Sequence, residues 1–128
     1  MDTALRELVR SRAGSRCEYC HLPEQFSELH FRIEHVIPRQ HGGTDGAENL
    51  ALACPDCNLV EGPNLTGVEP GTHRVARVFH PRRDKWTEHF ALDGALILGK
   101  TPVGRVTVSL LRMNDAQRLR GRALLSGL

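Results

Sequence analysis

The sequence has few aromatic residues and no long apolar run. Aromatic side chains make up 5% of the 128 residues, so a core of this size must be mainly aliphatic or must be helped by another stabilising element. No run of about 18 apolar residues is present, which excludes a membrane-spanning helix. The first residues, MDTALRELVRSRAG, are charged and have helical spacing, so we expect a cytoplasmic chain that starts without a signal peptide.

The sequence also lacks internal repeats and any segment with the composition of a linker. Its length is that of about one domain, so we predict a single domain over residues 1–128, with a core at about 15–65 and a C-terminal extension at about 70–128. Residues 1–70 carry six Lys or Arg against eleven Asp or Glu, whereas residues 71–128 carry eleven against four. We therefore expect the basic half to meet a polyanion, although basic residues on helices can also form a simple solvated face.

The spacing of apolar and turn residues predicts an α+β fold. A helix is expected at residues 3–13 and ends at Gly14. Residues 29–38 and 49–54 predict a β-hairpin with a long loop, and PDCNLVEG predicts a short helix after it. The other expected elements are a loop at 63–73, a strand at 74–81, two strands joined by an Asp93-Gly94 turn within 85–99, and helices at 101–114 and 115–128.

Four cysteines form two C-x-x-C pairs, with no cysteine left over. The pairs are CEYC, with Cys17 and Cys20, and CPDC, with Cys54 and Cys57. Each pair can direct two sulfurs at one point about 2.3 Å from a metal ion, which is typical of a tetrahedral zinc site. The 33 residues between the pairs exceed the usual zinc-finger spacing of about 15–20. A structured segment is therefore inserted there, and zinc would add on the order of 10 kcal/mol to folding.

The cysteines have three alternative uses. A disulfide framework disagrees with a cytoplasmic chain, and neither pair opens a helix after a thioredoxin-like strand, as a redox pair would. An iron–sulfur cluster is the third alternative. Structural zinc is the favoured interpretation, but zinc alone does not identify a function.

The segment between and just beyond the cysteine pairs carries polar residues in a fixed order. Glu34 and His35 lie on the first expected strand, Asn49 starts the second, and Asn58 follows the last cysteine. A hairpin followed by a helix is a ββα unit, which can hold one divalent cation between strand and helix. Successive strand residues point to opposite faces, so Glu34 and His35 act from different sides unless a twist or bulge near Pro38 intervenes.

The run CEYC…FRIEHVIPRQHGGTDGAENLALACPDCNLVEGPN closely resembles the HNH endonucleases, which have a ββα-metal fold. The order Glu-His, Asn-Leu, C-x-x-C-Asn is quite specific, and FHPRRDKWTEHF and TPVGRVTVSLLRMN resemble the tails of small stand-alone bacterial HNH proteins. The resemblance implies a metal-dependent endonuclease that hydrolyses phosphodiester bonds in nucleic acid, with DNA as the expected substrate. It also implies structural Zn²⁺ and a catalytic Mg²⁺ or Mn²⁺.

The resemblance further implies roles for four side chains. His35 matches the general base that activates water, and Asn49 matches the residue that fixes the loop and orients the histidine. Glu34 and Asn58 match the ligands of the divalent cation, which makes this chain an H-N-N variant with Glu where Asp is more usual. Mg²⁺ prefers oxygen ligands and keeps several waters, so two protein oxygens can suffice, and a neutral imidazole can accept a proton near pH 7.

Basic side chains provide the expected contacts to nucleic acid. Arg39 follows the first strand, while Arg82, Arg83 and Lys85 cluster beside Trp86, which either stacks on bases or packs in the core. The expected C-terminal helices carry further arginines: Arg105, Arg112, Arg118, Arg120 and Arg122. At helical spacing Arg105 and Arg112 share one face, and Arg118 and Arg122 share another. Nothing resembles a base-reading module, so we expect weak sequence preference.

Two other functions are open. The first is a catalytically silent, zinc-stabilised module that binds nucleic acid, which the Glu34 and Asn58 variations favour. The second is a nuclease toxin domain. His41, in the loop after the first strand, and His80, before the basic PRR, are secondary candidates for the site.

Overall fold

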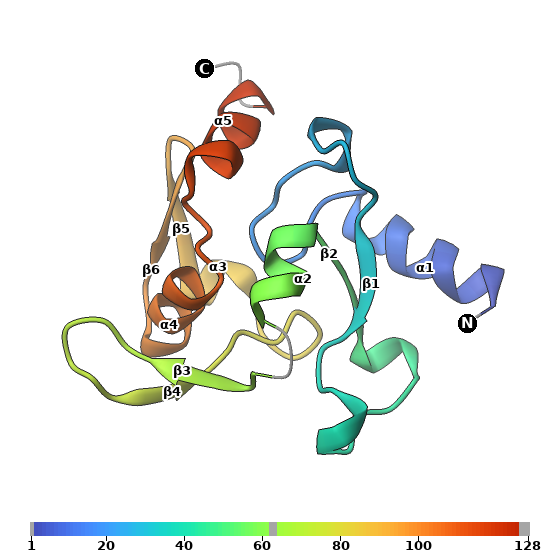
Figure 1. The fold of residues 1–128 in the computed structure, drawn as a ribbon, viewed down its shortest axis with the longest axis horizontal. Coiled ribbons are helices and arrows are strands. Elements are labelled where there is room, and N and C mark those ends of the chain that lie inside the picture. The colour runs from blue at the N-terminus through green and yellow to red at the C-terminus, as the bar shows by residue number, and fades with distance from the viewer. Residues whose placement is uncertain (1, 62–63, 126–128) are drawn as a thin grey trace.

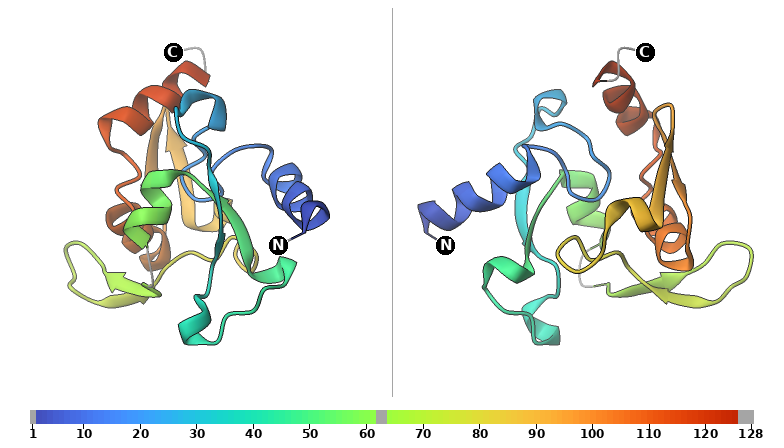
Figure 2. Two further views of the ribbon diagram at one scale, coloured as in Figure 1. Left: turned by 45° about the vertical axis from the view of Figure 1, so that its right-hand side comes forward. Right: turned by 180° about the vertical axis from the view of Figure 1, so that it is seen from behind.

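The computed structural model describes residues 2–61 and 64–125. Figure 1 shows two groups of elements on either side of the short helix α2 (Pro55–Glu61), and the view from behind in Figure 2 shows the same arrangement. One group contains α1 (Thr3–Ala13) and the hairpin of β1 (Arg32–His35) and β2 (Leu50–Ala53). The other group contains β3 (Thr66–Val68), β4 (Val75–Arg77), α3 (Trp86–His89), β5 (Phe90–Asp93), β6 (Leu96–Gly99), α4 (Pro102–Leu110) and α5 (Ala116–Leu125).

The α+β class and the ββα unit are confirmed, and α1 begins and ends as expected. The Asp2 carboxylate accepts a hydrogen bond from the backbone N–H of Leu5 at 2.7 Å, which caps the first turn of α1. Gly14 takes the left-handed conformation with φ 63° and donates to the carbonyl of Ser11. Within the described residues, no helix combines the length and the apolar character needed to cross a membrane.

The β1–β2 hairpin carries two of the four residues proposed for the site. The strands pair antiparallel, with Glu34 opposite Ala51 and His35 opposite Leu50, and every residue of β2 is buried. The expected strand is too long, because β1 ends at His35. Two residues later, the backbone N–H and C=O of Ile37 bond to the side chain of Asn49, so they cannot join the strand ladder.

Residues 66–68 form β3, where a loop was expected. This strand is built by its pairing with β4, in which Gly67 lies opposite Ala76. It also packs on α4, where a Cβ at Gly67 would lie 2.9 Å from Cγ1 of Val106. The packing partner on α4 is distant in sequence, and the local run of polar residues and glycine does not by itself indicate a strand.

Residues 86–89 form the helix α3 where a strand was expected. The indole N–H of Trp86 donates to the carbonyl of Tyr19 at 2.9 Å. The Trp86 ring stacks on His21 with centroids 4.0 Å apart and lies 5.0 Å from the ring of Phe90. These contacts place Trp86 in the packing against the first cysteine pair, and such tertiary contacts override local strand propensity.

Further boundaries differ from the sequence-based expectation, and of the strand expected at 74–81 only Val75–Arg77 form β4. The β5–β6 turn lies at residues 94–95, one residue later than expected, because Asp93 pairs with Leu96. Helix α4 begins at the expected Thr101 cap but ends at Leu110, four residues early. Arg112 has a φ of 49°, and this left-handed residue turns the chain away from the helix axis.

A single buried cluster joins the two groups of elements. It includes all four cysteines, Leu50 and Leu52 of β2, and the rings of Tyr19, Phe79 and Phe90. Phe79 meets Tyr19 and Phe90 edge to face, with centroids 6.4 and 5.1 Å apart. The aromatic-poor sequence therefore builds its core from aliphatic residues, a small aromatic group and the cysteine cluster.

Candidate active site and metal centre

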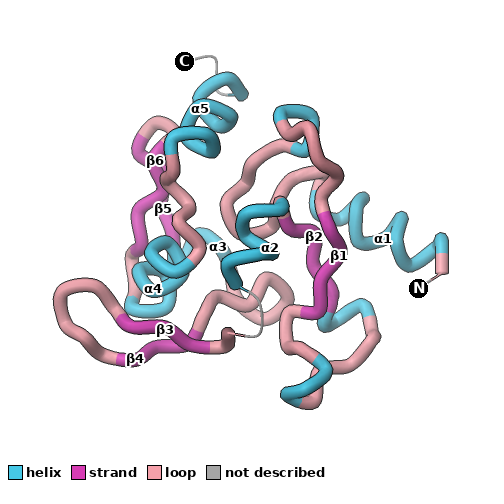
Figure 3. Tube along the Cα trace, viewed as in Figure 1, coloured by secondary structure: helices cyan, strands magenta, loops and turns pink. Residues whose placement is uncertain are grey.

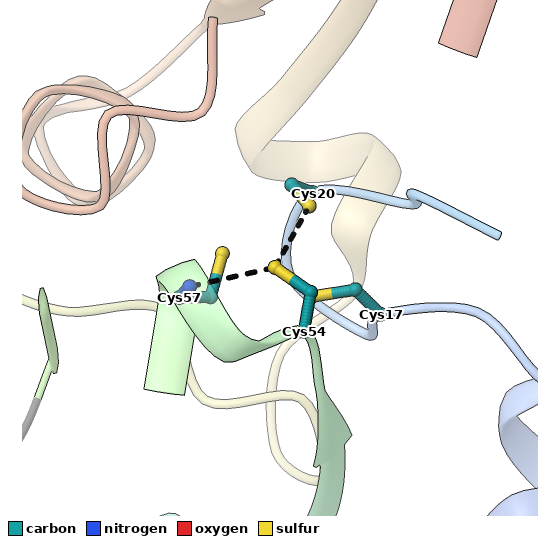
Figure 4. Close-up of side chains that lie close together, drawn as sticks. All are labelled: Cys17, Cys20, Cys54 and Cys57. Carbon is teal, nitrogen blue, oxygen red and sulfur yellow. Dashed lines mark hydrogen bonds between the residues drawn. The ribbon is translucent and has the colours of Figure 1, made fainter. Parts of the chain in front are cut away.

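The four cysteines converge on one point, as Figure 4 shows. Their sulfurs all lie within 4.8 Å of one another, and all four residues are buried and free of disulfides. The Sγ atoms of Cys20 and Cys54 are 3.7 Å apart, close to the roughly 3.8 Å edge of a tetrahedron whose Zn–S bonds are about 2.3 Å. The donor set and its spacing therefore fit a structural zinc ion, as the sequence predicted.

Arg118 of α5 contacts this cluster directly. Its side chain is 1% exposed, and its Nη1 donates to the Sγ of Cys57 at 3.0 Å. Its Nε donates to the Asp115 carboxylate at 3.1 Å, and its Nη2 donates to the carbonyls of Leu111 and Arg112. A residue expected on a nucleic-acid-facing helix thus lies inside the protein, where each of its three guanidinium nitrogens donates a hydrogen bond.

Arg122 lies one turn further along α5 and reaches the other cysteine pair. Its Nη1 donates to the backbone carbonyl of Cys20 at 3.2 Å, and its Nε donates to the carbonyl of Ala95 at 2.8 Å. Its Nη2 donates to Oδ1 of Asn114, which also accepts from the backbone N–H of Ile97 at 2.9 Å. The two arginines therefore fasten the C-terminal helix to both cysteine pairs.

The electrostatics of the cluster favour this arrangement. Burial raises the pKa of the Cys17 thiol well above its ordinary value, while hydrogen bonds from the other thiols lower the pKa of Cys20. Burial acts to lower the pKa of Arg118, but the neighbouring cysteine thiolates and Asp115 raise it more, so this pKa lies above its ordinary value. Four thiolates around one Zn²⁺ leave an excess of negative charge, which the two buried guanidinium groups oppose.

His35 stands at the end of β1, beside the connection to β2. Its side chain is 25% exposed, and its Nε2 lies 2.8 Å from Oδ1 of Asp45. Arg39 donates to the same oxygen from Nε at 3.0 Å and pairs with it from Nη2 at 2.9 Å. The hydrogen bond from His35 and the contact with Arg39 lower the pKa of Asp45. Asp45 is thus an ionised neighbour of the proposed base that the sequence did not single out.

Asn49 is buried and holds the β1–β2 connection in place. Its Oδ1 accepts from the N–H of Ile37 at 2.9 Å, and its Nδ2 donates to the carbonyls of Ile37 and Thr44 at 2.9 and 2.8 Å. Its own carbonyl accepts from the N–H of Val36 at 2.8 Å. Figure 3 shows this connection as loop with two short helical turns, residues 39–41 and 47–49, at one end of the hairpin.

Asn58 lies on α2 and Glu34 lies on β1, the helix and one strand of the ββα unit. Asn58, on α2, lines a surface depression together with Pro55 and Arg32 of β1. Arg32 and Glu34 are two residues apart on β1, so they share one face of the strand, and His35 projects from the other. A carboxylate and an amide are oxygen donors suited to Mg²⁺.

The predicted nucleic-acid contacts have different surroundings. Arg39 is exposed but tied to Asp45, and Arg82 is only 18% exposed and forms an ion pair with Glu18 of the first cysteine pair. Burial lowers the pKa of Arg82 to about 10. Arg83 and Lys85 are exposed. Of the secondary candidates, His41 is exposed in the β1–β2 connection, whereas His80 is buried and its Nδ1 accepts from the N–H of Arg82 at 3.1 Å.

Sequence reasoning missed Asp45, Glu18 and the inward direction of Arg118 and Arg122. The only signal for the arginines was their four-residue spacing, which places them on one helix face but does not say what that face meets. Asp45 lies in a polar, glycine-rich loop, where acidic residues are common. No pattern in the sequence distinguished these residues from a solvated surface.

Comparison with known proteins finds a family model that is similar to the central segment. The family model for HNH endonucleases matches residues 17–63. The chain is also 24% identical over 109 residues to the Septu protein PtuB of Bacillus thuringiensis. That alignment covers 84% of this chain and 40% of the relative, so the chain spans less than half of the relative's length. No solved structure matches the chain.

Proposed function

Because residues 17–63 match the family model for HNH endonucleases, we propose that this protein is a metal-dependent endonuclease that hydrolyses phosphodiester bonds in nucleic acid, with DNA as the expected substrate. One observation carries the proposal. Within the matched segment, His35 lies partly exposed at the end of β1, beside a connection that Asn49 clamps through its side chain. A fixed imidazole that water can reach is what a general base requires.

In this proposal His35 removes a proton from the attacking water. General bases contribute on the order of 10²–10⁴-fold to a rate, so the ring must be held in place rather than mobile. Asn49 supports this role indirectly, because its hydrogen bonds to Ile37 and Thr44 fix the backbone that follows the histidine. Val36, directly after the base, is bonded to the Asn49 carbonyl.

Glu34 and Asn58 are the proposed ligands of a catalytic Mg²⁺ or Mn²⁺. They come from the strand and the helix of the ββα unit, and both offer oxygen donors. When bound there, the cation would polarise the scissile phosphate and stabilise the leaving oxygen. The four cysteines hold zinc in a separate, structural centre.

Contact with the nucleic-acid backbone is proposed for Arg83 and Lys85, which are exposed, and for Arg39 beside the base. Arg82 contributes indirectly, because its ion pair with Glu18 fixes the segment that carries Arg83 and Lys85. The contacts are to phosphates, which position the chain without reading sequence.

The test is nicking of supercoiled plasmid and cleavage of RNA by zinc-replete protein in a series of divalent metals. We expect metal-dependent cleavage that falls by at least about 100-fold in His35→Gln. The matched control is His73→Asn, because His73 is exposed in the β3–β4 turn and asparagine tolerates its φ of 58°. Its activity should equal that of wild type.

Failure to cleave either nucleic acid in any metal would contradict the proposal, as would a His35→Gln variant that cleaves like wild type. Salt-sensitive DNA binding without any metal-dependent cleavage would instead support the catalytically silent binding module, for which the Glu at position 34 and the Asn at position 58 were the sequence argument.

A further inference from the structure

The two nitrogens of the His35 ring have different surroundings. Nε2 lies 2.8 Å from Oδ1 of Asp45. For Nδ1, no hydrogen bond is found among residues 2–61 and 64–125. The side chain of Asp45 is 70% exposed, and Arg39 contacts the same carboxylate oxygen. One ring nitrogen is therefore occupied by a carboxylate, and the other remains available to a ligand or to water.

This contact determines where the ring hydrogen lies. An ionised carboxylate is a hydrogen-bond acceptor only, and Arg39 keeps positive charge beside Oδ1 of Asp45. At 2.8 Å from that oxygen, Nε2 must carry the hydrogen. In the neutral imidazole the lone pair that can accept a proton is then on Nδ1.

The position of Asp45 is itself fixed by the fold. The carbonyl of Thr44, the preceding residue, accepts a hydrogen bond from Nδ2 of Asn49 at 2.8 Å. Gly43 donates to the carbonyl of Pro38 at 3.0 Å, and a Cβ at Gly43 would collide with the carbonyl oxygen of Ile37. These backbone contacts fix the connection directly before Asp45. The Asp45 carboxylate is therefore already placed beside the His35 ring.

We propose that Asp45 is a positioning residue that fixes His35 in the tautomer with hydrogen on Nε2, so that Nδ1 is the atom that takes the proton from water. This inference rests on the proposed nuclease function. As the O–H bond of water breaks, an N–H bond forms at Nδ1 and the hydroxide oxygen bonds to phosphorus. The P–O bond to the leaving oxygen then breaks, and that oxygen takes a proton from solvent. The imidazolium that results lies against the Asp45 carboxylate, which stabilises its charge.

Two other roles for Asp45 make different predictions. Asp45 could act only by holding Arg39 toward a phosphate, in which case its removal would weaken substrate binding and leave the chemical step unchanged. Asp45 could also block Nε2 until substrate displaces it, in which case its removal would raise the rate. The positioning role alone predicts a slower chemical step.

The first experiment compares cleavage by Asp45→Asn and wild type under single-turnover conditions. We expect kcat to fall by about 10–100-fold, the usual effect of losing a residue that orients a functional histidine, with KM changed less than threefold. Asp45→Glu should recover part of the loss, because it keeps an acceptor near Nε2. The matched control is Glu48→Gln in the same connection, since Glu48 is exposed and bonds to Thr44 but does not contact His35.

A double-mutant cycle separates the effect of Asp45 from that of Arg39. If Asp45 acts through Arg39, then Asp45→Asn should have no effect on kcat in an Arg39→Gln background. The positioning role predicts that the loss in kcat persists there. A kcat that is unchanged or higher in Asp45→Asn, or a loss that disappears in the Arg39→Gln background, overturns the inference.

A measurement that needs no activity completes the test. Long-range ¹H–¹⁵N correlation at pH 8 reports the tautomer of each neutral histidine, and the His35 signals are identified by their disappearance in His35→Gln. We expect hydrogen on Nε2 in wild type and a mixture or the other tautomer in Asp45→Asn. Hydrogen on Nδ1 in wild type overturns this inference alone, whereas absence of cleavage by a wild-type protein with the expected tautomer overturns the nuclease proposal and with it the base role of Nδ1.

Discussion

Arg118 and Arg122 lie inside the molecule, although arginine is rarely buried unless it is paired. Arg118 donates to the Sγ of Cys57, and Arg122 donates to the carbonyl of Cys20. Every nitrogen of the Arg118 guanidinium has an acceptor. Such a site is stable only when negative charge is nearby, and the four cysteine thiolates of a zinc centre would supply it. Outer residues of this kind commonly tune metal affinity.

Replacement of Arg118 by methionine should weaken zinc binding. The change removes the donor to Cys57 and leaves the excess thiolate charge less compensated, so we expect about 10–100-fold lower zinc affinity, measured by competition with a chromogenic chelator. Arg118→Lys should lose less, because it keeps the charge but not the planar fork. Arg120→Met is the control, since Arg120 is exposed on the same helix. Equal zinc affinity in the Arg118 and Arg120 variants would contradict this role.

At the scale of elements, the connection between β1 and β2 is organised by one buried side chain. Asn49 replaces strand pairing at Ile37 and bonds to the carbonyl of Thr44. It therefore ends β1 at His35 and closes the loop that carries Asp45. The sequence placed Asn49 at the start of the second strand, and the structure places it in the short turn immediately before β2.

Asn49→Ala should loosen this connection. The N–H of Ile37 loses its acceptor, and an unsatisfied buried donor costs about 1–3 kcal/mol, which denaturant unfolding would measure. Amide exchange should accelerate at Ile37, and cleavage should fall because His35 is no longer held. Asn49→Asp keeps the acceptor for Ile37 but loses both donated bonds, so it should be intermediate. Asn64→Ala, at an exposed position, is the control, and exchange at Ile37 no faster than in this control would argue against the clamp.

At the scale of the whole molecule, part of the positive charge of the C-terminal half is used within the fold. Its net excess of basic residues predicted a polyanion-binding surface, but many of these residues meet internal partners. The pairs and contacts are Arg77 with Asp84, Arg82 with Glu18, Arg105 with Glu69, Arg118 with Asp115 and Cys57, and Arg122 with Asn114. The positive surface available to nucleic acid is therefore smaller than the sequence count indicates.

Removal of zinc should unfold both groups of elements together. The buried cluster contains the four cysteines as well as Phe90, Leu111 and Met113 from the C-terminal half, and structural zinc supplies on the order of 10 kcal/mol. Trp86, the single tryptophan, bonds to Tyr19 in the first cysteine pair. Its fluorescence should therefore change together with far-UV circular dichroism as a chelator is added. Separate transitions would show that the C-terminal half folds without the metal centre.

The sequence alone determined the α+β class, the cysteine cluster, the ββα unit and the HNH resemblance, because each depends on short-range spacing or on a fixed order of residue types. It also placed α1 and the start of α4, whose caps are local hydrogen bonds. Only the tertiary structure decided that α5 turns Arg118 and Arg122 inward, that Asp45 meets His35, and that β3 and α3 form. These features depend on contacts with segments distant in the chain. The charge of a side chain and its helical spacing do not indicate which part of the protein it will contact.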